Sequence, residues 1–246
     1  MTCIIGTIDK EKKIAFFIAD NLAIDGHSFK KINECREKLV LKEVIIEDYI
    51  VPIVFGVSGS EVVLDFLKYT FDKFDCKKIP NCKFEPNTTD WMVSYILNHF
   101  VPQFKKKFME YYDIDKFDKR KMIEYYSYGI LIGTNDKLFE INSNGTLRKD
   151  MDVAIVGSGK PFLSGYYVGY QTAIKYFPNT ESEDTTKNND EDIWASVEEA
   201  LYSVSQHNVS VGSTKENYTK ILLTEKDKPR KISKEPKKEE DVDENI

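Results

Sequence analysis

Cysteine and histidine are scarce in this 246-residue chain, which has four cysteines and three histidines. Cys76 and Cys82 are the only near neighbours among the cysteines, and the five residues between them match no zinc-binding pattern. The histidines at positions 27, 99 and 207 are too dispersed to complete a metal site. We therefore expect no metal centre, and we expect free thiols in a reducing compartment.

An excess of positive charge and a long apolar run are also missing. The chain has 35 Lys and Arg against 41 Asp and Glu, a net charge of −6, so it has no net field that would attract nucleic acid. No run is long enough to cross a bilayer, and the start MTCIIGTIDK lacks the basic and apolar parts of a signal peptide. We expect a soluble, cytoplasmic protein that binds neither nucleic acid nor membranes.

Large apolar side chains are abundant, with 14 Tyr and 15 Phe, and they are enough to build a substantial core. The last segment, EKDKPRKISKEPKKEEDVDENI, has no aromatic residue and only two isolated aliphatic ones. Because it cannot bury enough surface to offset its ordering entropy, residues 225–246 are predicted to be a disordered charged tail. Residues 2–224 are predicted to form one domain.

Runs of strand and helix character alternate in blocks along the domain. Strands are predicted at 3–8, 14–19, 39–46, 49–57, 126–133, 137–141, 153–156 and 218–224. Helices are predicted at 61–74, 90–111 with a kink or break at Pro102, after the glycines near 159, and at 193–205. Strand runs separated by pairs of helices predict an α+β fold, and strands that are apolar on both faces indicate two stacked sheets between helices.

Thr2 is the first residue with a candidate chemical role. A residue this small after Met1 permits removal of the initiator Met, which would leave Thr2 with a free α-amine. Such an amine has a pKa near about 7.7–8, so it can take the proton of the threonine hydroxyl at neutral pH. Because Thr at position two is common, Thr2 carries weight only together with the residues around it.

Three segments supply that context: TCIIGTIDKEKKIAFFIAD, VFGVSGS and VAIVGSGKPFLSGYYVG. With them the chain resembles the proteasome β-subunits and bacterial proteasome-like peptidases, which are amino-terminal-nucleophile hydrolases. The resemblance covers Thr2 to about Thr224 and implies a four-layer αββα sandwich. It also implies a threonine peptidase that works without a cofactor, in a homo-oligomeric ring, on peptides or unfolded proteins. A separate ATP-dependent unfoldase is a possible partner, since the chain has no nucleotide-binding loop of its own.

The resemblance assigns roles to Thr2, Asp20 and a lysine. Thr2 matches the nucleophile and Asp20 matches the carboxylate that holds a lysine. Lys31 matches that lysine best, but the spacing is unusual, so Lys30 and Lys38 remain alternatives. Each of these residues taken alone has an ordinary reading, a strand-end carboxylate or a solvated lysine, and the prediction depends on their order.

The remaining assignments concern the oxyanion and the threonine amine. Gly59 matches the glycine whose backbone N–H stabilises the oxyanion, and Ser158 matches the serine beside the amine. Asn208 stands where the family has an aspartate, and an amide keeps a hydrogen-bonding carbonyl but loses the charge. This substitution keeps open a non-catalytic ring subunit as the alternative, beside a small-amide hydrolase of the same superfamily or a plain binding domain.

Overall fold

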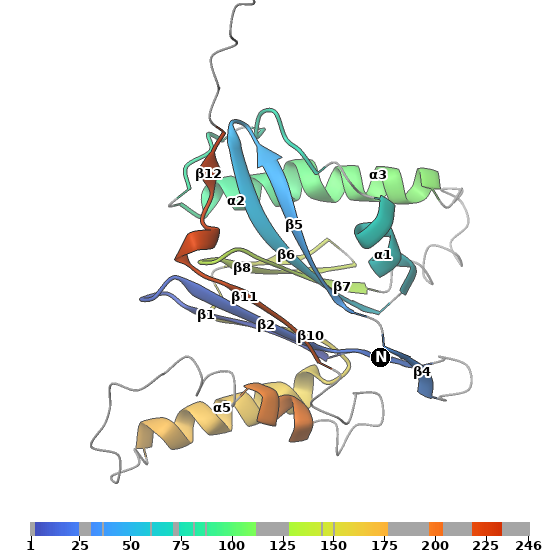
Figure 1. Cartoon of the computed structure of the whole chain (residues 1–246), viewed down its shortest axis with the longest axis vertical. Helices are drawn as coiled ribbons and strands as arrows, with labels where there is room; N and C mark the ends of the chain where they lie inside the picture. Colours follow the sequence, from blue (N-terminus) through green and yellow to red (C-terminus); the bar gives the residue numbers. More distant parts are fainter. Residues whose placement is uncertain are drawn as a thin grey trace, which may run out of the picture.

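The computed structural model describes residues 3–24, 31–35, 37–59, 61–70, 74–80, 82–86, 88–111, 128–143, 145–149, 151–176, 197–203 and 218–232. These residues form four layers, with two stacked antiparallel sheets between an upper and a lower layer of helices (Figure 1). The predicted α+β sandwich of αββα type is confirmed.

The lower sheet has the strand order β10-β1-β2-β11. Its strands are β1 (Cys3–Asp9), β2 (Ile14–Asp20), β10 (Val153–Gly157) and β11 (Tyr218–Leu223). β1 and β2 are buried along almost their whole length because the second sheet covers one face and helices cover the other. The predicted amino-terminal hairpin is confirmed.

The upper sheet has the order β12-β6-β7-β8-β9, and β5 also pairs with β6. Its strands are β5 (Leu39–Ile46), β6 (Tyr49–Gly59), β7 (Tyr128–Gly133), β8 (Leu138–Asn142), β9 (Leu147–Arg148) and β12 (Arg230–Lys231). A separate two-stranded sheet of β3 (Leu22–Ile24) and β4 (Lys31–Cys35) follows β2, and the sequence analysis did not predict it.

Helices cover the outer face of each sheet (Figure 1). The upper layer contains α1 (Glu61–Asp65), η1 (Phe66–Thr70), α2 (Asp90–Tyr95), η2 (Ile96–Phe100) and α3 (Val101–Tyr111). The lower layer contains α5 (Lys160–Tyr176) and helical residues 197–203. Three buried apolar clusters fill the spaces between successive layers, and the middle one lies between the two sheets.

The helix across Pro102 continues without the predicted break. Proline lacks an N–H, and its ring clashes with the carbonyl four residues earlier, which here belongs to Asn98. The turn before it is a π-helix, η2, in which the Val101 N–H donates to the Ile96 carbonyl, five residues back. A wider turn of this kind accommodates the proline, so α2, η2 and α3 follow one another directly.

The segment after Thr224 differs from the predicted disordered tail. Glu225–Asp227 form a short 3-10 helix, η4, capped by Thr224 and Asp227, and Arg230–Lys231 form β12, which pairs with Ile50 and Tyr49 of β6. The pairing uses backbone groups, which a search for apolar residues does not detect. Residues 233–246 lie outside the described part, where the tail stays a prediction.

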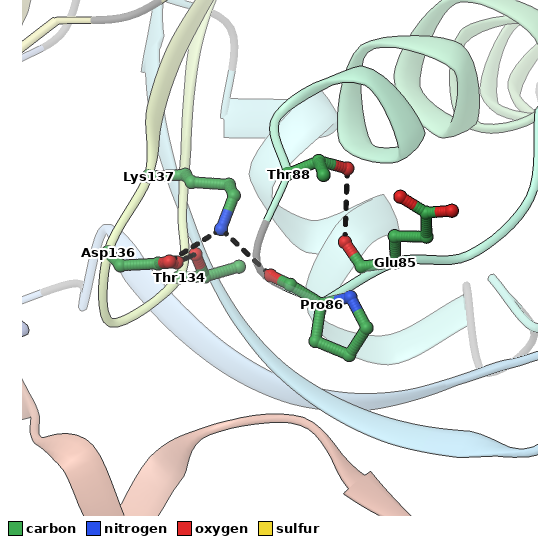
Figure 2. A network of polar contacts seen from close by, with 6 residues as sticks. All are labelled: Glu85, Pro86, Thr88, Thr134, Asp136 and Lys137. Carbon is green, nitrogen blue, oxygen red and sulfur yellow. Dashed lines mark hydrogen bonds and ion pairs between the residues drawn. The ribbon is translucent and has the colours of Figure 1, made fainter.

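A partly buried polar network fastens the turn between β7 and β8 to the segment before α2 (Figure 2). The Lys137 ammonium is 2.5 Å from the Asp136 carboxylate and donates to the Pro86 carbonyl at 3.1 Å. Thr134 donates to the other oxygen of Asp136 at 3.0 Å. Because Lys137 is only 8% exposed, these contacts replace the water that its charge has lost.

Candidate active site

Asp20, the last residue of β2, has a fully buried side chain that ties together the starts of two strands. One carboxylate oxygen accepts the backbone N–H of Cys3 at 2.6 Å, and the other is 3.1 Å from the Lys38 ammonium. Ile4 pairs with Ala19, so this side-chain bond continues the β1–β2 ladder by one position. Asp20 is therefore bonded to the residue that directly follows Thr2 in the chain. Thr2 itself lies outside the described residues.

Lys38 precedes β5, and its side chain is 7% exposed. Its carbonyl accepts the Val57 N–H at 3.1 Å, so the backbone at Lys38 is fastened to β6. A buried ion pair gains little net stability because both charges must be desolvated. The main effect of this pair is therefore geometric: it fixes a charged group at the end of β2.

Among the three lysines that the sequence left open, the structure describes the side chain of Lys38. Its ammonium contacts Asp20. Lys31 is the first residue of β4, where it pairs with Ile24 in the small sheet. Lys30 lies outside the described residues. The signal for Lys38 in the sequence is its place directly before the apolar run of β5.

Gly59 ends β6 with a φ of +100°, a left-handed conformation that favours glycine. It pairs with Tyr128, and the neighbouring Ser58 donates from its hydroxyl to the Gly129 carbonyl at 3.3 Å. A Cβ on Gly129 would lie 3.6 Å from Val156 of the lower sheet. The end of β6 therefore lies over the end of β10.

The Gly157-Ser158-Gly159 loop connects β10 to α5 at the same end of the sandwich. Gly157 pairs with Cys3 and has a φ of +110°, Ser158 is exposed, and Gly159 is buried. The Gly159 carbonyl accepts the Leu163 N–H at 3.0 Å, in the first turn of α5. Cys3 and Gly157 are the last described pair of the β1–β10 ladder at this end. The residue that follows Gly157 is Ser158, and the residue that precedes Cys3 is Thr2.

The thiol of Cys3 does not fit the role of nucleophile. It lies in the lower apolar cluster with Ile5 and Ile155. Burial raises the pKa of this thiol far above its ordinary value, the charge of Asp20 raises it further, and Lys38 opposes both effects less strongly. The thiol stays protonated at neutral pH, and a thiolate is the reactive form of cysteine.

The structure brings Asp20, Lys38, Gly59 and Ser158 to one end of the two stacked sheets. Thr2 and Asn208 lie outside the described residues, so their roles stay predictions. The sequence analysis missed Glu140, whose buried carboxylate lies near this end on β8. The sequence does mark this residue: Glu140 is the single charge in the strand LFEIN. It stands two residues after Leu138, so both side chains lie on the inward face of the strand.

In the described part of the chain, no three His, Cys, Asp or Glu side chains are grouped as metal ligands would be. None of the described helices combines the length and apolar character needed to cross a membrane. What the site offers is a buried carboxylate–ammonium pair beside the start of β1. A fixed ammonium suits acyl transfer, in which negative charge develops on oxygen.

No family model matches the chain, and no curated protein matches its sequence. Solved structures do match. Eukaryotic HslV from Trypanosoma brucei has a TM-score of 0.51 and 12% identity, covering 91% of this chain and 99% of that one. Thiobacillus denitrificans BPH in complex with epoxomicin has a TM-score of 0.55 and 14% identity, over 91% and 98% of the two chains.

Anbu from Yersinia bercovieri is similar to the same extent, with a TM-score of 0.53 and 12% identity over 95% of this chain and 88% of that one. The fold is proteasome-like. It is the fold of amino-terminal-nucleophile hydrolases, and the similarity spans nearly the whole chain. At such low identity the comparison shows the fold alone, so the chemistry depends on the residues of the site.

Proposed function

We propose that this protein is a threonine-type peptidase whose nucleophile is Thr2, exposed by removal of Met1. The observation that supports this most strongly is the pair of bonds made by Asp20, one to the Cys3 N–H and one to the Lys38 ammonium. They fasten a buried cation to the backbone residue that follows Thr2. In this proposal Lys38 takes the role that the sequence analysis gave to Lys31.

The reaction starts when the Thr2 amine takes the proton of the Thr2 hydroxyl, directly or through a water. The hydroxyl oxygen bonds to the substrate carbonyl carbon, and the Gly59 N–H stabilises the resulting oxyanion. The carbon–nitrogen bond then breaks, and the leaving amine takes the proton from the Thr2 ammonium. Water, activated by the same amine, hydrolyses the ester and regenerates the threonine.

The charged groups have supporting roles in this sequence. Lys38 favours the neutral Thr2 amine and stabilises the developing alkoxide, because a nearby positive charge disfavours a second one and attracts an anion. Asp20 holds Lys38 in place. In this proposal Ser158 and Asn208 form hydrogen bonds beside the Thr2 amine.

The proposed substrates are peptides and unfolded proteins, and the proposed assembly is a ring of identical subunits in the cytoplasm. The proteasome-like fold supports the ring. A separate ATP-dependent unfoldase would deliver folded substrates. The proposals on substrate, assembly and unfoldase depend on the proteasome-like fold and on the order of the site motifs along the chain.

Intact-mass measurement before and after exposure to epoxomicin tests the proposal. An epoxyketone needs both the hydroxyl and the free amine of a terminal threonine. We expect the purified chain to lack Met1 and to gain one epoxomicin per subunit, and we expect Thr2→Ala to gain none. Native mass spectrometry of the same sample measures the ring.

One sequence observation favours a second candidate, a non-catalytic subunit of such a ring. Asn208 supplies no carboxylate where the family has one. A chain that retains Met1, forms rings and takes up no epoxomicin would establish this alternative. A chain that is labelled but turns over small amides and not peptides would instead be an amidohydrolase.

A further inference from the structure

Glu140 carries a buried charge on β8 at a position where apolar side chains fill the space between the sheets. Its side chain is 4% exposed and alternates in phase with Leu138 of the middle cluster. The Lys160 ammonium contacts both carboxylate oxygens, at 2.7 and 2.8 Å. Arg148 of the neighbouring strand β9 is 3.7 Å from one of them.

This ion pair connects the upper sheet to the start of α5, the helix that follows β10 of the lower sheet. Glu140 belongs to the upper sheet, where it pairs with Leu131 of β7. Lys160 is the first residue of α5, directly after the Gly157–Gly159 loop that leaves β10. The pair therefore connects the far end of the loop to the sheet that carries Gly59.

Lys160 occupies an electrostatically unfavourable position. The amino terminus of a helix carries partial positive charge, so carboxylates stabilise it and ammonium groups do not. The first turn of α5 has no acidic residue, and Lys160 stands there instead. Glu140 supplies the negative charge from another layer, and burial of that charge is tolerated because Lys160 and Arg148 compensate it.

The loop needs an anchor because of its glycines. Glycine has more conformational freedom than any other residue, and Gly157 already takes a left-handed φ of +110°. On the β10 side the pairing of Gly157 with Cys3 holds the loop. On the α5 side Lys160 is the next residue after Gly159, and its contact with Glu140 holds that end.

We infer that Glu140 is a positioning residue that, through Lys160, fixes the Gly157–Gly159 loop and so sets the place of Ser158 beside the amino terminus of β1. The role in catalysis rests on the proposed function, while the anchoring of the loop does not. Because a displacement of about 1 Å can slow a reaction by up to about 100-fold, an unanchored loop would lower the reaction rate more than substrate affinity.

The variants Glu140→Gln and Lys160→Met each remove one charge while keeping most of the side-chain volume. Lys160 is one-third exposed, so Lys160→Met also provides a test if Glu140→Gln fails to fold. Lys160→Arg keeps the charge and is the rescue variant. Arg148→Met is the matched control, because it removes the more distant and more exposed cation from the same carboxylate.

Two measurements on the full-length chain separate the anchor from the activity. The first is hydrogen exchange of peptides covering 153–163, followed by mass spectrometry. We expect faster exchange there in Glu140→Gln and Lys160→Met, wild-type exchange in Lys160→Arg and Arg148→Met, and no change in β6 in any variant. Unchanged exchange at 153–163 in both charge-removing variants would overturn the inference, whether or not the protein is active.

The second measurement is the rate of epoxomicin labelling as a function of its concentration. We expect the maximal rate to fall between about 10-fold and about 100-fold in the two charge-removing variants, with the half-saturating concentration unchanged. Faster exchange with an unchanged maximal rate would overturn the positioning role. A wild-type chain that is never labelled would overturn the proposed function and the positioning role, while the exchange data would still decide the anchor.

Discussion

Two buried ion pairs lie near the same end of the sandwich, Asp20–Lys38 and Glu140–Lys160. Each joins a carboxylate on a strand to a lysine at or directly before the start of a later element, so each fixes a backbone position near the site. Since a buried pair adds little net stability, its main effect is on geometry. Removing one partner is costly because the other charge remains buried and uncompensated.

Lys38→Met is expected to lower the free energy of unfolding by about 3–5 kcal/mol, because it leaves the Asp20 carboxylate buried without its ammonium. It is also expected to abolish epoxomicin labelling. Denaturant unfolding and intact mass measure the two effects. Lys31→Met is the matched control and should label as wild type does. Loss of labelling in Lys31→Met alone would return the site lysine to the position that the sequence favoured.

His99 is expected to make the protein less stable in acid. Burial lowers the pKa of its imidazole, more than the charge of Asp75 and the backbone groups of Asp75 and Phe74 raise it. Within the described part of the chain, its buried Nε2 has no hydrogen-bond partner. The unfolded chain, whose His99 has the ordinary pKa, therefore binds more protons, and stability falls as the pH drops through that value toward the lowered one.

Thermal unfolding of wild type and His99→Gln between about pH 7 and about pH 5 measures this contribution. The melting temperature should fall less steeply with acid in the variant, because a neutral amide does not titrate. Parallel curves for the two proteins would show that His99 is not the group responsible.

At the scale of elements, close contact between the two sheets depends on glycine. Gly133 ends β7 opposite Phe17 of β2, and a Cβ at Gly133 would lie 2.3 Å from the ring atom Cζ and 2.9 Å from Leu138. Phe17 is fully buried, so the ring has no free space to move into. The sheets can therefore approach each other here only because residue 133 has no side chain.

Gly133→Ala is expected to destabilise the protein by about 1–3 kcal/mol, the usual cost of overpacking a core. Gly165→Ala is the matched control, since a Cβ there meets no other described part of the chain within 4 Å and alanine favours a helix such as α5. Urea unfolding of both variants measures the difference. Equal stability of Gly133→Ala and wild type would mean that the sheets separate without cost.

For the whole molecule, the segment from Tyr218 to Ile232 connects the two sheets. β11 pairs with β2 in the lower sheet, and β12 pairs with the part of β6 at Tyr49 and Ile50 that β7 does not reach. The Ile232 N–H donates to the Asp48 carbonyl at 2.8 Å, and Arg230 is 2.7 Å from Glu43. The end of this segment therefore closes an edge of the upper sheet.

A chain ending after Thr224 is expected to fold but to lose about 1–2 kcal/mol, from the few backbone hydrogen bonds of β12 and the cap of η4. The exposed Arg230–Glu43 pair adds little. A chain ending after Ile232 should match the full-length protein. Denaturant midpoints compare the three, and an equal loss in both shortened chains would place the stabilising contacts beyond residue 232.

The sequence by itself determined the order of the main strands and helices and indicated two stacked sheets between helices. A continuous apolar run such as 14–19 requires other elements to cover both faces of the strand. Such a run can be recognised from neighbouring residues in the sequence alone. The candidate positions Asp20, Gly59 and Ser158 came from the resemblance to the proteasome-like family, and all three lie at one end of the sandwich.

Only the tertiary structure showed that Lys38 contacts Asp20, that Lys160 compensates the charge of Glu140, and that the segment after Thr224 pairs with an edge of the upper sheet. Each of these two buried carboxylates is compensated by a lysine that is distant in the sequence, and spacing along the chain does not encode which residues meet. Backbone pairing is equally hidden, because every residue except proline carries the same donor and acceptor.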